Sequence, residues 1–138
     1  MKLTTKTRYG TRLVLDLALH HGQGAVRMSE ISTRQNISVK YLEQLIRPLK
    51  KAGLVDSVRG PKGGHFLTKN PEKITLGQIT RIFEGSIDLV ECINDSEKCA
   101  KADDCVTRTA WQMAAQALFD KLDGITIANL MADTKCIK

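Results

Sequence analysis

Three of the chain's four cysteines lie close together in one polar stretch. Cys92, Cys99 and Cys105 are separated by six and five intervening residues, so a loop can bring three thiolates to one centre. Structural zinc usually takes paired Cys-x2-Cys ligands, which are absent here, whereas iron–sulfur clusters accept looser spacing although they prefer four thiolates. The spacing therefore favours iron–sulfur ligation. Reactive thiols without a metal, a zinc site and inert cysteines remain open alternatives, and we interpret Cys136 in the tail as a bystander.

The sequence carries no signal for export or for a membrane span. The N-terminal residues MKLTTKTRYG contain no apolar core and no cleavage site, and no apolar run approaches the roughly 18 residues that a span needs. We therefore expect a cytoplasmic protein with no membrane partner. In that reducing compartment, cysteines serve metal or redox chemistry more often than structural disulfides.

Charge divides the chain into two unequal halves. Residues 1–69 contain thirteen Lys and Arg against four Asp and Glu, whereas residues 70–138 contain eight bases against eleven acids. A basic first half favours contact with a polyanion through that half alone. Charge by itself is equally compatible with a solvated basic face, so the pattern of elements must decide.

Hydrophobic periodicity predicts a mainly α fold with a small β-hairpin. Residues 1–84 are expected to form a winged helix-turn-helix domain, and residues 85–138 a cysteine loop and a long dimerisation helix. The predicted helices cover 7–20, 29–35, 39–52, 75–84, 106–122 and 126–130, and the strands cover 54–58 and 65–68.

Two local features carry specific expectations. In the first helix, Arg12 and Asp16 are predicted to face outward, opposite the apolar stripe. In the third helix, Pro48 removes a backbone donor and crowds the carbonyl of Gln44, so we expect a kink or an early end near residues 44–48.

The third predicted helix has the features of a helix that reads DNA. Its leucines face inward, and its other side is polar. Gln44 can pair with an adenine edge, Glu43 can accept from cytosine, and a basic side chain can meet guanine or phosphate. The predicted contacts to double-stranded DNA are Ser38, Lys40, Tyr41, Glu43, Gln44 and Arg47 on this helix, with Arg59 and Lys62 among the glycines of the hairpin tip. The alternative is a protein-interaction module with an incidental basic face.

The helix predicted over 106–122 carries more apolar surface than a small monomer covers. Pairing with its copy would bury that surface and place two DNA-reading helices about one DNA turn, roughly 34 Å, apart. We therefore expect a homodimer on a palindromic operator. The alternative is that the helix packs onto its own domain.

Several stretches together resemble one known family. These stretches are KLTTKTRYGTRLVLDLAL, IS followed by YLEQLIRPLKKAGLV, SVRGPKGG, ITLGQI and the three-cysteine loop. Over essentially its full length, the chain is similar to the Rrf2 family of winged-helix transcription regulators, and most to its IscR-like branch. The resemblance implies a homodimer joined through the long helix, palindromic DNA sites, and a [2Fe–2S] or [4Fe–4S] cluster whose state tunes DNA affinity. It places Ser38, Tyr41, Glu43 and Gln44 in the recognition helix and Arg59 in the wing.

The sequence departs from the family at the fourth cluster ligand. IscR-like members use a histidine three residues after the last cysteine, where this chain has Arg108. NsrR-like members use an early aspartate of the other subunit, where this chain has Arg8. A guanidinium stays protonated and does not ligate iron. The fourth ligand is therefore unassigned; candidates are Glu97, Asp103, Asp104, Cys136 and a solvent or small-molecule ligand.

An enzymatic function is not expected. His20 and His21 end a helix and His65 lies on the wing, where surface roles are expected, and the GPKGG segment lies between strands and not before a helix. The sequence thus predicts a DNA-binding regulator that senses iron–sulfur cluster, redox or nitric-oxide status through three cysteines. The alternative is a cluster-free DNA-binding regulator that responds through thiols or a protein partner.

Overall fold

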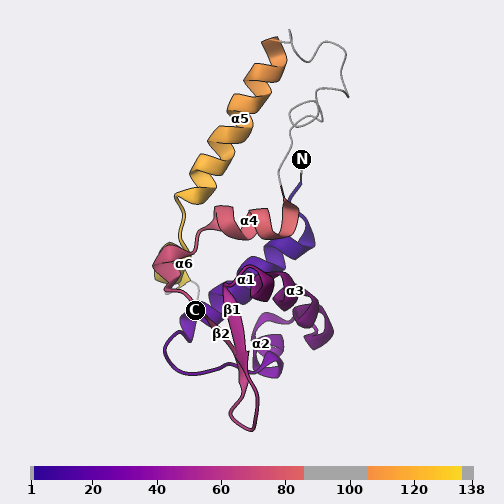
Figure 1. The fold of residues 1–138 in the computed structure, drawn as a ribbon, viewed down its shortest axis with the longest axis vertical. Coiled ribbons are helices and arrows are strands. Elements are labelled where there is room, and N and C mark those ends of the chain that lie inside the picture. Colours follow the sequence, from indigo (N-terminus) through magenta and orange to yellow (C-terminus); the bar gives the residue numbers. More distant parts are fainter. Residues whose placement is uncertain (1, 86–105, 135–138) are drawn as a thin grey trace.

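The computed structural model of the chain describes residues 2–85 and 106–134, and it confirms the predicted fold class. A small helical body carries a two-stranded antiparallel hairpin, and one long helix projects away from it (Figure 1). The elements are α1 (Thr5–Leu19), α2 (Met28–Gln35), α3 (Val39–Lys51), β1 (Val55–Val58), β2 (Gly64–Leu67), the 3-10 turn η1 (Pro71–Lys73), α4 (Leu76–Glu84), α5 (Val106–Asp123) and α6 (Ile127–Thr134).

The helix-turn-helix is built from α2 and α3, packed against α1. Asn36 ends α2 in the left-handed conformation, with φ 55°, which an asparagine tolerates better than most residues. Two residues later Ser38 begins α3. The shared core contains Leu13, Leu17, Ile31, Leu42, Leu45 and Leu49, all essentially inaccessible to solvent.

Of the kink or early end of α3 expected near residues 44–48, the early end is wrong. The helix continues past Pro48 to Lys51, and the amide of Ala52 still donates to the Pro48 carbonyl at 3.0 Å. A proline removes only one helical hydrogen bond, and Leu45 and Leu49 on either side of it are buried in the core. Burial of these flanking residues offsets the local loss.

The wing is a hairpin that is joined to the start of α2. Val55 pairs with Leu67 and Val58 with Gly64, and the backbone of Val26 bonds His65 in both directions at 2.8 Å. Gly64 has φ +155°, and a Cβ there would lie 2.4 Å from the Val26 carbonyl oxygen. A glycine is therefore required for the hairpin to approach residue 26 this closely.

The C-terminal helix α6 returns to the first helices. The amide of Leu76 donates to the carbonyl oxygen of Ile125 at 2.9 Å, and the amide of Ile127 donates to the carbonyl oxygen of Ile74 at 2.8 Å. Ile127 is fully buried in the same core as Leu13. The chain that follows α5 is thus bonded to the segment that precedes α4, near the base of α5.

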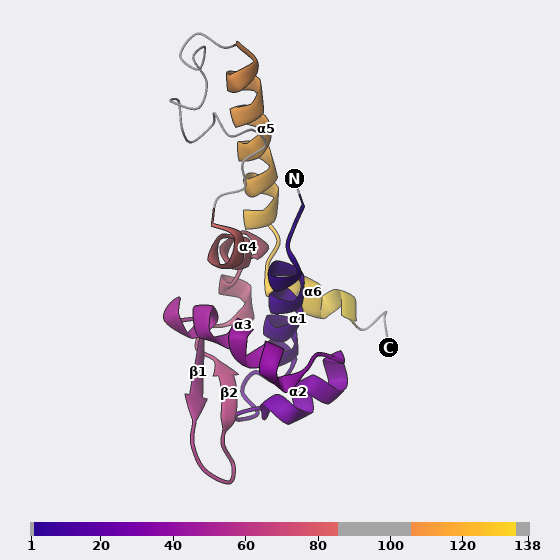
Figure 2. The same cartoon turned by 90° about the vertical axis from the view of Figure 1, so that its right-hand side faces the viewer.

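Helix α5 extends from this base into solvent (Figures 1 and 2). Within α5, Ala115 is the one buried residue, while Val106 and Met113 are 83% and 68% exposed. The base is held by Arg81 of α4, which bonds both carboxylate oxygens of Asp123 at 2.6 and 2.9 Å and stacks over Phe119. The predicted long helix is confirmed, and Val106, Trp111 and Met113 on it are uncovered in the single chain.

The end of α4 also supports the beginning of α1. Glu84 Oε1 accepts from the amide and hydroxyl of Thr4, both at 2.7 Å, and from the Thr7 hydroxyl at 2.5 Å. The hydrogen bond from the Thr7 hydroxyl has the largest effect, followed by that from the Thr4 hydroxyl, and both lower the pKa of Glu84 below its usual value. The ionised carboxylate therefore acts as a cap at a helix N-terminus, where negative charge is favourable.

The attachment of the wing to residue 26 can be tested with two glycine substitutions. Gly64→Ala should lower the free energy of unfolding by about 3 kcal/mol, because the new methyl group meets backbone and the left-handed conformation is strained. Gly24→Ala is the control, since Gly24 also has positive φ but nothing within 4 Å of its Cβ position, and it should cost only about 1 kcal/mol. Equal losses in urea unfolding would contradict the close approach.

Candidate nucleic-acid interface

The first turn of α3 is fixed by its N-cap. The Ser38 hydroxyl accepts from the amide of Tyr41 at 3.2 Å, which satisfies one of the helix's free N-terminal donors. Leu42, Leu45, Ile46 and Leu49 are all buried on the side facing the body. The opposite side of α3 must therefore face solvent.

The structure places the predicted contact residues of α3 in three different environments. Lys40, Glu43, Gln44 and Arg47 are exposed, and within the described residues their side chains form no hydrogen bond or ion pair. Ser38 is exposed but its oxygen is engaged as the cap. Tyr41 is half-buried, with its ring edge-to-face against Tyr9 of α1 at 5.9 Å. The polar side chains available to a ligand are thus the exposed four.

The wing presents the other two predicted residues. Arg59 and Lys62 are exposed in the loop that joins β1 to β2. Lys50 near the end of α3 donates to the Ser57 hydroxyl at 2.9 Å, which links α3 to β1. Arg27, the residue before α2, donates to the Pro61 carbonyl in the loop. The wing loop is therefore attached to the helix-turn-helix through a side chain that the sequence analysis did not single out.

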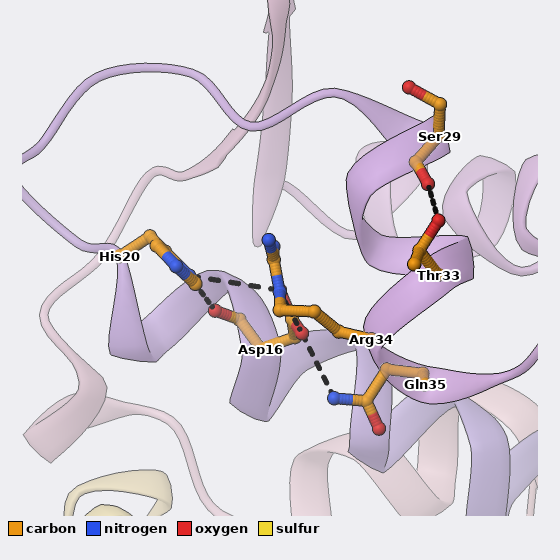
Figure 3. A network of polar contacts seen from close by, with 6 residues as sticks. All are labelled: Asp16, His20, Ser29, Thr33, Arg34 and Gln35. Atoms are coloured by element: carbon orange, nitrogen blue, oxygen red, sulfur yellow. Dashed lines mark hydrogen bonds and ion pairs between the residues drawn. The ribbon is translucent and has the colours of Figure 1, made fainter.

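Asp16 of α1 is buried, so the prediction that it faces outward is wrong. Its carboxylate is 2% exposed and accepts from Arg34 Nε at 3.0 Å, from Arg34 Nη2 at 2.7 Å and from Gln35 Nε2 at 2.9 Å (Figure 3). The bonds to Asp16 raise the pKa of Arg34 above its usual value. A charge buried beside an apolar stripe needs such partners, which come from α2, 18 and 19 residues further along the chain.

Basic side chains surround the aromatic pair at the start of α3. Arg12 lies over the Tyr9 ring at 5.3 Å and Arg8 at 6.0 Å, within the range of cation–π attraction. Arg12 is exposed, as predicted, and its Nε donates to Gln35 Oε1 at 3.1 Å. Positive charge is therefore held beside the end of α3 that begins at Ser38.

His65 differs from the expected surface histidine. It is half-buried on β2, and its Nδ1 is the one buried side-chain polar atom without a hydrogen-bond partner among the described residues. Burial, assisted by the positive charge of Lys50, lowers the pKa of His65. The ring is therefore predominantly neutral near pH 7 and adds little positive charge to the wing.

The predicted cysteine site lies outside the described residues. This applies to Cys92, Cys99 and Cys105 and to the candidate fourth ligands Glu97, Asp103, Asp104 and Cys136. Arg108 is half-buried in the first turn of α5, and Arg8 lies on α1. Over residues 2–85 and 106–134, no group of three His, Cys, Asp or Glu residues is arranged to hold a metal ion.

Comparison with known proteins identifies the family. A family model described as an iron-dependent transcriptional regulator, Rrf2, matches residues 3–133. The chain belongs to the Rrf2 family. The resemblance seen in the sequence is thereby confirmed. Separately, no helix in the described ranges has the length and hydropathy needed to cross a bilayer.

Relatives of this Rrf2-family chain are transcription regulators and not enzymes. It is 45% identical to Protein rrf2 of Nitratidesulfovibrio vulgaris over 96% of the chain and 89% of the relative. It is 43% identical to the HTH-type transcriptional regulator IscR of Aliivibrio salmonicida over 98% of the chain and 80% of the relative. The structure of CymR, the global cysteine regulator of B. subtilis, is similar with a TM-score of 0.80 and 39% sequence identity. The match covers 96% of this chain and 97% of CymR.

The buried pair predicts an asymmetric response to substitution. Arg34→Met leaves the Asp16 carboxylate buried without its cation and should cost about 3 kcal/mol of unfolding free energy. Asp16→Asn should cost less, about 1–2 kcal/mol, because the Arg34 side chain is 37% exposed and can turn to water.

Urea unfolding measures both values, with Arg47→Met as the control. Arg47 is exposed, and its replacement should change stability by less than about 0.5 kcal/mol. A loss for Arg34→Met no larger than that of Arg47→Met would show that Asp16 does not need its ion pair.

Proposed function

We propose that this chain is a homodimeric regulator that binds palindromic DNA and senses iron–sulfur cluster, redox or nitric-oxide status through a cluster held by Cys92, Cys99 and Cys105. The observation that carries the DNA-binding part is the exposed polar face of α3, where Lys40, Glu43, Gln44 and Arg47 form no hydrogen bond or ion pair within the described residues, although the opposite face is fully buried. Membership of the Rrf2 family supports it.

Side chains of α3 have the chemistry to read bases in a major groove. Gln44 offers the amide that pairs with an adenine edge, Lys40 and Arg47 offer donors to guanine or phosphate, and Glu43 accepts from cytosine. Glu43 also repels phosphate, so it contributes discrimination more than affinity. Arg59 and Lys62 in the wing contact the sugar-phosphate backbone or a minor groove, where they add affinity.

The proposed dimer uses α5. Its 18 residues span about 27 Å, and they leave Val106, Trp111 and Met113 exposed to solvent. An apolar surface of this kind indicates an interaction site, and a second copy of the helix offers the same apolar side chains in return. Pairing of two α5 helices places two α3 helices on successive half-sites of a palindrome.

The three cysteines suit a [2Fe–2S] or [4Fe–4S] cluster with one position left to another ligand. Thiolates are the ligands of such clusters, and when bound the cluster supplies reversible electron transfer and an iron open to small molecules. Cys105 is the residue directly before Val106, where α5 begins. A cluster bound by Cys105 is therefore attached one peptide bond from the start of α5. Arg8 and Arg108 contribute positive charge and not iron ligands.

A cluster-free regulator is the second candidate. The similarity to CymR, the global cysteine regulator of B. subtilis, favours it, as does the missing histidine at position 108. In that case the same DNA-binding surface responds to oxidation of the cysteine thiols or to a partner protein.

The division of roles between α3 and the wing predicts different binding defects. Gln44→Ala should relax preference at one position of each half-site by about 1–3 kcal/mol. Lys62→Ala should weaken binding to all duplexes alike and reduce the slope of log K against log salt by about one unit. Binding titrations on a selected operator and on random duplex measure both, and equal sequence-independent losses would show that α3 does not read bases.

The cluster predicts colour and metal content that depend on three particular cysteines. Anaerobically purified protein should be brown and contain about two or four iron atoms and as many sulfides per subunit. Cys92→Ser, Cys99→Ser or Cys105→Ser should abolish both signals, whereas Cys136→Ser should retain them; loss of both in Cys136→Ser would identify Cys136 as the fourth ligand. A colourless, iron-free protein that binds DNA and loses binding on thiol oxidation would establish the second candidate instead.

A further inference from the structure

A few large apolar side chains remain exposed in the described residues, and one of them lies on the recognition helix. Those on α5 are accounted for by the proposed dimer. Val39 is the exposed large apolar residue of α3, with 38% of its surface accessible. The whole set is Leu3, Leu19, Val39, Val58, Val106, Trp111 and Met113.

Val39 occupies the first position of α3, directly after the Ser38 cap. It lies one helical turn before Glu43 and is followed by Lys40, both exposed. The buried stripe begins at Leu42, on the other side of Val39. The valine methyl groups therefore lie at the edge of the polar face, at the end of α3 whose first turns face base edges when such a helix enters a major groove.

The backbone that carries the Val39 side chain is fixed, and the side chain itself has few rotamers. A β-branched residue in a helix has one strongly preferred χ1 rotamer. The backbone around it is fixed by the bond from the Tyr41 amide to the Ser38 hydroxyl and by the bond from the Leu42 amide to the Ser38 carbonyl at 3.0 Å. Packing of Tyr41 against Tyr9 fixes the same turn to α1. An apolar group presented rigidly in this way can discriminate among partners by shape and hydropathy.

We propose that Val39 is a specificity-determining residue that contacts the C5-methyl group of one thymine in each half-site. The thymine methyl is the apolar group that base pairs display in the major groove, so it is the one base feature that an exposed valine there would cover with gain. The inference rests on the proposed function, in which α3 enters the major groove. It adds a thymine to the bases read by the polar residues.

Replacement of thymine by uracil tests this contact at the level of one methyl group. An operator is first selected from random duplexes with the purified full-length protein, and each thymine is then replaced in turn by deoxyuridine, which leaves base pairing unchanged. For the unsubstituted protein, uracil at one position per half-site should weaken binding about fourfold, as expected for one methyl-sized group removed from an apolar contact.

Two alanine variants assign the effect to a residue. Val39→Ala should bind the thymine and uracil operators equally well, and it should fold because alanine is the best helix former. Val58→Ala, which removes the same methyl groups from an exposed position on the wing, should retain the full fourfold difference. Circular dichroism confirms that both variants are folded.

Each other outcome is decisive. If uracil has no effect at any position, or has the same effect on Val39→Ala as on the unsubstituted protein, Val39 does not read a thymine, although α3 still binds DNA. If no duplex is selected over random competitor, the proposed function fails first, and the inference about Val39 fails with it.

Discussion

The buried carboxylate of Asp16 fixes the end of α2 against α1, and α3 follows from that end. This carboxylate is a charge buried within α1, and it is stabilised by the guanidinium of Arg34 and the amide of Gln35, both at the C-terminal end of α2. Burial of an ion is unfavourable unless its partners keep good geometry. The end of α2 therefore has little freedom relative to α1, and α3 begins at Val39, three residues after the left-handed Asn36. The direction of α3 is set by the turn at Asn36 and by the leucines beneath the helix.

The first helix is the element against which the others are positioned. At its beginning, Glu84 of α4 accepts from Thr4 and Thr7. In its first half, Gly10 leaves space for the Phe83 ring, because a Cβ there would lie 2.3 Å from that ring. Tyr9 contacts Tyr41 of α3 from the same helix. Helix α1 thus joins α2 and α3 to α4, which in turn holds the base of α5.

Most of the fold followed from local patterns, whereas the errors arose from contacts between distant residues. The apolar stripe of α3, the glycines around the wing and the long helix from Val106 are visible in sequence and were predicted correctly. The burial of Asp16 was missed because Arg34 and Gln35, which donate to its carboxylate, lie on a different helix. Pro48 was expected to kink α3 or end it early because the packing of Leu45 and Leu49 cannot be weighed from sequence. The DNA contacts, the division at residue 84 and the cysteine site stay predictions.

The attachment of α5 at one end makes it a lever. Arg81 clamps Asp123 and Phe119 at the base, and the chain that follows is bonded to Ile74 and Leu76. The helix is about 27 Å long, so a displacement of about 5 Å at Val106 corresponds to a tilt of only about 10° at the clamp. In the proposed dimer, a small tilt of α5 at this clamp would thereby rotate the body and change the span between the two α3 helices.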